Sequence, residues 1–273
     1  MPEVLPLLGR RALVTGAAGG IGEAIAMGLA RQGADLVLHH LDDPDEHART
    51  AALAGEIEGA GRRASRFASD FVDAAGAERL ARFALAGGEA IDIVVANAAL
   101  ERRGPWERVN DDAIAAHVAA NFASLLCLLR ILLEPMRARG WGRVVALGSV
   151  LAKRPRSETV VYAAMKAAQL VAIRAIARDV AVDGVTLNVV SPGAIEMRRT
   201  ASRYADDAFR KAVVAKIPAG RQGQPSDCLA PVLMLCSDGA GYITGADIPV
   251  DGGWSLGDAP GSLPATGSRA TSD

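Results

Sequence analysis

The feature that most constrains the fold is a regular alternation of short apolar segments with helix-forming ones. Seven segments have the length and the β-branched composition of strands: 11–16, 34–40, 62–70, 91–99, 141–150, 185–193 and 243–253. Helical stretches separate most of them, including the long runs 111–140 and 160–181. The strand segments are mostly apolar throughout, which is typical of parallel strands covered by helices on both faces. The pattern therefore predicts an α/β chain with a mainly parallel sheet.

Right-handed crossovers turn such an alternation into a doubly wound, Rossmann-like sheet of seven strands. Residues 1–256 are predicted to form one Rossmann-like domain, because no repeat or break in composition divides them. The tail, residues 257–273, is rich in Gly, Ser, Pro, Ala and Thr and is predicted to be flexible.

Composition narrows the class of partner. The formal net charge is −1, which does not favour nucleic acid or an anionic membrane surface. No signal peptide and no uninterrupted apolar run of about eighteen residues is visible, so we expect no membrane segment. The three cysteines form no C-x-x-C pair, and the four histidines lack metal-ligand spacing. These features favour a cytoplasmic protein without a bound metal.

A glycine-rich turn follows the first strand segment: Thr15-Gly16-Ala17-Ala18-Gly19-Gly20-Ile21-Gly22. Glycines allow a tight turn and close approach of backbone to a pyrophosphate, and the helix that begins there offers free N–H groups to the anion. An ordinary structural turn is the alternative. The position in the first strand–turn–helix unit favours a dinucleotide site.

A second motif carries proton chemistry. Tyr162 and Lys166 stand at i and i+4, on one face of a predicted helix. An ammonium beside a phenol favours the phenolate and lowers the pKa of the phenol, which suits proton exchange with an alcohol or carbonyl. Ser149 ends the fifth strand segment, and Asn121 lies inside an otherwise apolar helix, where an amide is unfavourable without partners.

The order and spacing of Asn121, Ser149, Tyr162 and Lys166, together with the pattern T-G-x-x-x-G-I-G, resemble the short-chain dehydrogenase/reductase family. The resemblance runs from about Gly9 to Trp254. It implies an NAD(P)-dependent oxidoreductase that interconverts a secondary alcohol and a ketone by hydride transfer, with these four residues as the catalytic set. Tyr162 then exchanges a proton with the substrate oxygen, Ser149 hydrogen-bonds that oxygen, and Asn121 anchors a relay water. Lys166 holds the nicotinamide ribose.

The same resemblance implies the residues that contact the cofactor. Asp70 is expected at the adenine amino group, Asn97 beside the adenine ribose, and the segment 191–195 over the nicotinamide. The full predicted set is Gly16, Gly20, Ile21, Gly22, His40, Asp42, Asp70, Phe71, Asn97, Ala98, Tyr162, Lys166, Pro192, Gly193 and Ile195.

Three motifs depart from the family pattern. The family's N-N-A-G reads Ala96-Asn97-Ala98-Ala99 here, and Gly148 and Met197 stand where the family usually has Ser and Thr. The last change removes a hydroxyl expected to orient the nicotinamide carboxamide, and Thr200 is a candidate replacement.

The choice between NAD and NADP depends on the end of the second strand. The family's NAD-dependent members usually have an acidic residue at the position of His40, and its NADP-dependent members a basic one at Leu41 or Gly19. Neither is present. Asp42, Asp43, Asp45 and Glu46 oppose a 2′-phosphate, and Asp42 can accept from a ribose hydroxyl. The sequence favours NAD, with NADP open through a contact from His40.

The substrate is less constrained. Charged residues on the expected rim indicate either a solvated edge or an anionic substrate: Glu101, Arg102, Arg103, Lys153, Arg154, Arg156, Arg198, Arg199 and Arg203. A sugar, a polyol or another small hydroxy compound is one expectation, and a 3-oxoacyl thioester on an acyl carrier protein is the alternative. A cofactor-binding regulator without turnover is a further class, which the complete catalytic set disfavours.

Two helices predict self-association. Residues 111–137 and 160–182 are apolar nearly all round, which indicates burial from more than one side. Closed symmetric assemblies are the usual solution. We expect a homotetramer. The family resemblance implies that these helices form one contact, and residues 248–250 are expected to form a second. The alternative is that the tail folds back over the helices.

Overall fold

The computed structural model describes residues 5–257, so the predicted tail lies outside the described residues except at Gly257. Seven strands form one sheet in the order β3-β2-β1-β4-β5-β6-β7, and every adjacent pair is parallel. The strands are β1 (Arg11–Val14), β2 (Asp35–His40), β3 (Ala64–Ala68), β4 (Ile93–Ala96), β5 (Gly142–Leu147), β6 (Val185–Pro192) and β7 (Asp247–Val250). The predicted doubly wound, Rossmann-like class is confirmed.

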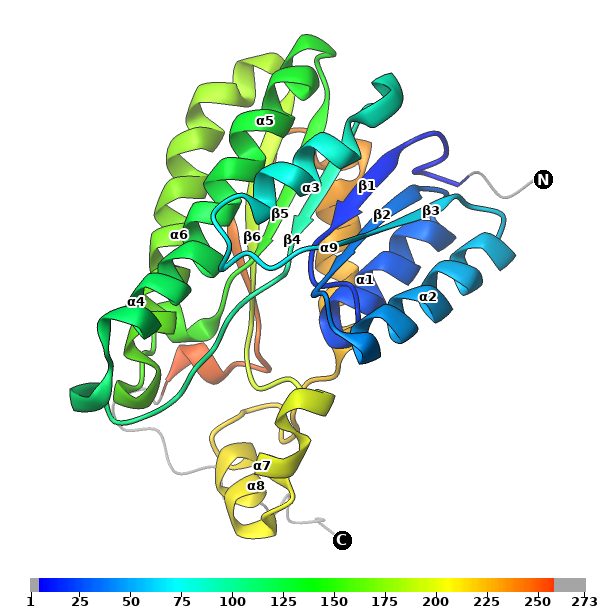
Figure 1. Cartoon of the computed structure of the whole chain (residues 1–273). Coiled ribbons are helices and arrows are strands. Elements are labelled where there is room, and N and C mark those ends of the chain that lie inside the picture. Colours follow the sequence, from blue (N-terminus) through cyan, green and yellow to red (C-terminus); the bar gives the residue numbers. More distant parts are fainter. Residues whose placement is uncertain (1–4, 258–273) are drawn as a thin grey trace, which may run out of the picture.

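Helices cover both faces of the sheet (Figure 1). One face carries α1 (Gly20–Arg31), α2 (Pro44–Gly59) and α9 (Leu229–Cys236), and the other carries α3 (Gly76–Ala84), α5 (Ser124–Ala138) and α6 (Val160–Val180). Alternate strand residues enter the two cores: Val14 and Val95 pack on one side, and Leu13 and Val94 on the other. This is why the strands are apolar throughout.

The predicted long helix 111–140 is two helices joined by a wider turn. α4 (Asp111–Val118) passes into a π-helical turn, Ala119–Ala123, before α5 begins. Asn121 lies in that turn, and its amide accepts from Leu100 N–H at 3.0 Å and donates to Leu100 C=O at 2.9 Å. Such a turn frees an internal side chain to bond outside the helix. Here it holds the segment that follows β4.

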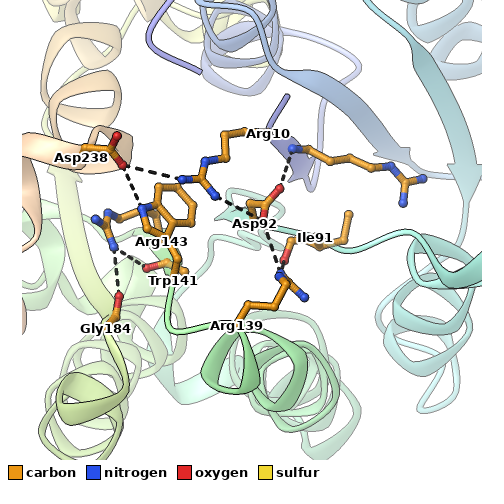
Figure 2. A network of polar contacts seen from close by, with 10 residues as sticks. Arg10, Ile91, Asp92, Arg139, Trp141, Arg143, Gly184 and Asp238 are labelled. Atoms are coloured by element: carbon orange, nitrogen blue, oxygen red, sulfur yellow. Dashed lines mark hydrogen bonds and ion pairs between the residues drawn. The ribbon is translucent and has the colours of Figure 1, made fainter. Parts of the chain in front are cut away.

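A cluster of charged and aromatic side chains closes the amino-terminal edge of the sheet (Figure 2). The ring of Trp141 lies 3.6 Å from the guanidinium carbon of Arg10 and 4.4 Å from that of Arg143. Its Nε1–H donates to Asp238 at 2.9 Å. Asp92 accepts from Arg11 N–H at 3.0 Å. The edge is thereby tied together where β1, β4 and β5 begin.

An excursion between β6 and α9 lies at the opposite edge of the sheet, where the strands end. It contains α7 (Ala201–Tyr204) and α8 (Asp207–Val214), which project from the rest of the molecule (Figure 1).

Two helical stretches are long and apolar enough to cross a membrane by length and composition, Asp111–Ala138 and Ser157–Asp183. Within their most apolar windows 56% and 33% of the residues are buried. The core helices of a doubly wound sheet satisfy the same criterion, so it is weak evidence for a membrane segment.

Candidate active site

A groove runs along the carboxyl ends of the central strands. Two adjoining pockets form it, and both are lined by Ile21, Asn97, Ala99 and Met197. Ligands of open α/β sheets bind at this edge, where the strand order reverses beside β1. The first pocket contains the predicted proton-transfer residues, and the second the glycine-rich turn.

The glycine-rich turn has the geometry of a phosphate cradle. Gly16 and Gly20 adopt left-handed φ values of 66° and 59°, which favour glycine. A Cβ on Gly22 would lie 2.1 Å from Gly16 C=O, so this glycine is needed for the turn itself. α1 begins at Gly20, and within residues 5–257 no side chain caps its N-terminus. Its first N–H groups are left for an anion, as a dinucleotide pyrophosphate requires.

His39 stabilises this turn through hydrogen bonds, a role that was not predicted from the sequence. Its Nδ1 accepts from Gly16 N–H at 3.2 Å, and its Nε2–H donates to Ser69 C=O at 2.9 Å. The ring stacks on Phe71, with centroids 4.3 Å apart. Burial lowers the pKa of His39 to about 4, against the hydrogen bond to Ser69, so the ring is neutral at pH 7. The only signal in the sequence was a histidine within a buried strand.

The candidate proton-transfer residues converge from β5 and α6. Ser149, Tyr162 and Lys166 line the same pocket, and their exposed fractions are 8%, 7% and 2%. Lys166 Nζ donates to Leu147 C=O at 2.6 Å and lies 5.7 Å from the centre of the Tyr162 ring. Ser149 Oγ accepts from Leu151 N–H at 3.1 Å. Helical spacing therefore brings the ammonium beside the phenol, next to the end of β5.

The other predicted residues divide into two groups. On the wall of the groove lie Gly16, Gly20, Ile21, Asn97, Ala98, Pro192, Gly193 and Ile195. The linings of the two pockets do not include Gly22, His40, Asp42, Asp70, Phe71 and Asn121. Among these, Asp42 pairs with His47 at 2.8 Å and His40 Nδ1 contacts Leu41 C=O at 2.8 Å, so both are engaged within their own loop.

The end of the groove beside the glycine-rich turn, called the adenosine end after the contacts predicted there, combines acidic side chains with Arg49 of α2 and Arg198. Asp43, Asp45 and Glu46 line it together with Arg49. Arg49 Nε–H donates to Ala18 C=O at 2.8 Å, which places its guanidinium beside the glycine-rich turn. The acidic residues were expected from the sequence and Arg49 was not, because composition does not reveal which face of α2 is turned toward the glycine-rich turn.

The substrate end of the groove is polar and aromatic. Trp254, Tyr204 and Thr200 line it with Glu101, Arg103 and Arg156. Arg103 pairs with Glu101 and, at 3.5 Å, with Glu158. Arg156 lies 5.2 Å above the Trp254 ring. Thr200 Oγ1–H donates to Met197 C=O at 2.9 Å, so the candidate replacement hydroxyl stands on the wall but bonds to its own loop.

Comparison with known proteins identifies the family. A family profile described as enoyl-(acyl carrier protein) reductase matches residues 16–255. The chain is 38% identical to a 3-oxoacyl-[acyl-carrier-protein] reductase of Pseudomonas aeruginosa over 91% of this chain and 98% of the relative. It is 33% identical to a 2-dehydro-3-deoxy-D-gluconate 5-dehydrogenase of Pseudoalteromonas atlantica, over 93% and 99%.

A solved structure gives the same result. A putative NAD(P)-dependent gluconate 5-dehydrogenase of Beutenbergia cavernae with bound NADP superposes with a TM-score of 0.86 at 35% identity, covering 93% of this chain and 100% of that one. The chain belongs to the short-chain dehydrogenase/reductase family. It is an oxidoreductase that uses a nicotinamide dinucleotide to interconvert an alcohol and a carbonyl compound.

Proposed function

We propose that Tyr162 is the acid–base residue of this reaction, with Ser149 and Lys166 as its partners and Asn121 as the anchor of the adjoining loop. The observation that supports the proposal most directly is that Ser149, Tyr162 and Lys166 line one pocket beside the glycine-rich turn. Asn121 does not line it, and its bonds to Leu100 instead fix the segment after β4.

In this proposal each side chain has one task. The bound nicotinamide supplies or accepts the hydride. Tyr162 Oη gives a proton to the substrate oxygen during reduction and takes it back during oxidation. Ser149 Oγ donates a hydrogen bond to the same oxygen and steadies the developing charge. Lys166, held by Leu147 C=O, places a positive charge near the phenol and favours its ionised form.

We propose NAD as the preferred coenzyme. Its support is the acidic lining of the adenosine end, where Asp43, Asp45 and Glu46 disfavour the charge of a 2′-phosphate. Titration calorimetry with NAD⁺ and NADP⁺ tests this choice, and tighter binding of NAD⁺ is expected. The solved relative named above contains NADP. Tighter binding of NADP⁺ here would contradict the proposal and point to Arg49, the arginine beside the turn.

We propose a small polyhydroxy compound or sugar acid as the substrate. The substrate end is lined by charged, hydroxyl and aromatic side chains together with the apolar Val150, Leu151 and Met197. The charged and hydroxyl side chains can hydrogen-bond several hydroxyl groups of one substrate. One relative acts on 2-dehydro-3-deoxy-D-gluconate by its name, which supports the same class. A 3-oxoacyl thioester on an acyl carrier protein is the alternative, favoured by the identity to the Pseudomonas enzyme.

A panel of paired substrates tests the class. Reduced-nicotinamide absorbance is followed with aldonates, alditols and aldoses in the oxidative direction, and with an acetoacetyl thioester in the reductive direction. We expect turnover with polyhydroxy compounds. Arg156→Met should raise the KM of an aldonate about tenfold, and Arg102→Met, in the same rim but off the pocket wall, should not. Turnover with the thioester alone would contradict this substrate class.

We also propose a cytoplasmic location and a homotetrameric state. The location is supported by the composition and by the three cysteines, none of which forms a disulfide. Fractionation of the producing cells, with this chain found in the membrane pellet, would contradict it.

A further inference from the structure

A buried carboxylate joins the two loops that meet at the reaction centre. Asp247 begins β7, and its side chain is only 2% exposed. Its Oδ1 accepts from Ser191 Oγ–H at 2.6 Å, and its Oδ2 lies 2.7 Å from Lys153 Nζ. Ser191 comes directly before Pro192 and Gly193 on the pocket wall. Lys153 comes four residues after Ser149.

The space around this carboxylate explains one departure from the family pattern. A Cβ on Gly148 would lie 2.6 Å from Ser191 Oγ and 2.6 Å from a methyl of Val189. A side chain at position 148 is therefore incompatible with the Ser191 hydroxyl in its present place. Val189 pairs with Asp247 in the β6–β7 register, so Val189, Ser191 and Asp247 share one face of the sheet.

The cost of burying a charge favours keeping Asp247 and Lys153 paired. A carboxylate with so little exposure is costly unless a charge and hydrogen bonds compensate it. Lys153 is half exposed, and its backbone N–H donates to Val150 C=O in the turn that follows Ser149. Moving that turn away would leave the carboxylate buried without its cation. The pair therefore penalises displacement of the Ser149 turn relative to β6 and β7.

We infer that Lys153, Asp247 and Ser191 form a positioning network that fixes the Ser149 turn against the Pro192–Gly193 turn. None of the three touches the reacting atoms. The inference rests on the proposed role of Ser149. It extends that proposal: Lys153, Ser191 and Asp247, which lie on three separate elements, together hold Ser149 in position relative to the nicotinamide.

Four variants test the network. Asp247→Asn keeps the shape and the acceptor for Ser191 but removes the charge, and Lys153→Met keeps the aliphatic stem. Each should lower kcat about tenfold, because small displacements of reacting groups are costly. Coenzyme Kd, measured by fluorescence, should stay within about twofold, since the adenosine end is untouched. Lys153→Arg should restore kcat, and Lys216→Met, an exposed lysine elsewhere, should leave it unchanged.

Two further measurements distinguish a positioning role from general damage to the fold. They are the coupling between the two substitutions and the hydrogen exchange of the backbone. In the double variant, which combines Asp247→Asn with Lys153→Met, the two losses of kcat should not multiply. Either change alone already breaks the ion pair between these residues. Hydrogen exchange of residues 149–153 should quicken in both single variants without a global increase. If the Lys153→Met protein does not fold, the double variant is used in its place, because it does not leave an unpaired charge buried at position 247.

Three results would overturn the inference: unchanged kcat, multiplying losses, or a loss of coenzyme affinity in proportion to kcat. Tyr162→Phe serves as the reference for the proposed function. If it abolishes turnover while Asp247→Asn does nothing, only the network is wrong. If Tyr162→Phe retains full turnover, the proposed catalytic set is wrong, and the exchange measurement still decides whether the network holds the turn.

Discussion

Individual buried polar side chains around the groove bind backbone groups of neighbouring loops. Lys166 holds Leu147 C=O, His39 holds Gly16 N–H, and Asn121 holds both backbone groups of Leu100. Buried backbone groups at the ends of strands need such partners, because the ladder of hydrogen bonds stops there. These three side chains therefore fix the loops that form the groove.

Tyr162→Phe should retain coenzyme binding and lose turnover. Only the phenolic hydroxyl is removed, so the ring still fills its place beside Lys166, while the proton donor is absent. General acid–base catalysis is typically worth about 10² to 10⁴ in rate, and kcat should fall by that factor. Tyr242→Phe is the control, since Tyr242 is fully exposed. Turnover of Tyr162→Phe close to that of the unmodified protein would remove Tyr162 from its proposed role.

His39 should make the protein less stable as the pH falls. Its pKa drops from 6.5 to about 4 on folding, so the unfolded chain binds the proton first, and stability declines between about pH 6.5 and pH 4. The loss is of order 3 kcal/mol at the acid end of this window. Urea titrations at several pH values measure it. His39→Gln should flatten the dependence, and His47→Gln, at an exposed histidine, should not; equal slopes in all three proteins would disprove the assignment.

At the residue scale, the sequence predicted the site residues that belong to a motif. It did not predict residues whose role depends only on the folded geometry. Gly16, Ser149, Tyr162 and Lys166 were expected on the groove and lie on its wall. His39 was missed, because its contacts depend on how β2, β3 and the glycine-rich turn approach one another.

At the scale of elements, the turn between β1 and α1 has glycines with different tasks. Gly22→Ala places a methyl 2.1 Å from Gly16 C=O and should cost about 3 kcal/mol, since backbone must move to admit it. Gly19 has an extended φ of 164° and no neighbour closer than 3.8 Å to an added Cβ. Gly19→Ala should therefore change stability by less than about 0.5 kcal/mol. Thermal and urea unfolding distinguish the two variants, and equal losses would show that the turn rearranges freely.

The opposite edge of the sheet should affect stability without affecting chemistry. Trp141→Phe removes the hydrogen bond to Asp238 and weakens the contacts of the ring with Arg10 and Arg143 (Figure 2). Together these are worth about 1 to 2 kcal/mol. Denaturant unfolding should show that loss while kcat stays constant, with Trp106→Phe at an exposed tryptophan as the control. A fall in kcat would contradict this prediction, because it would show that a change at this edge alters the geometry of the groove.

Helix boundaries were the least predictable elements. The apolar run 111–140 has the pattern of one continuous helix. The helix α5 continues through Pro135, whereas the interruption falls at Asn121. Within the π-helical turn, the amide of that residue bonds both backbone groups of Leu100, on the segment after β4. That segment is distant in sequence, so no local pattern could reveal the pairing.

At the scale of the whole molecule, the periodicity of the sequence determines the fold more closely than the assembly. Strands apolar on both faces require helices on both faces, and the right-handed crossover then leaves few possible strand orders. An assembly depends instead on side chains left exposed after folding. The described surface leaves apolar side chains on α4 and α6 uncovered: Ile114 is 42% exposed, Val118 37%, Val160 44% and Val171 68%.

These exposed side chains are the basis for expecting a homotetramer. A helix with apolar residues outside its buried face is usually covered by a partner, and closed symmetry lets identical faces cover each other. The expected mass by light scattering at micromolar concentration is about 113 kDa, four times the 28.2 kDa of one chain. Val171→Glu should reduce the mass to about half of that value, because a charge in a symmetric contact meets its own copy across the axis. Val72→Glu, at another exposed valine outside α4 and α6, should not. A mass close to that of one chain for the unmodified protein would show that these faces are not an interface.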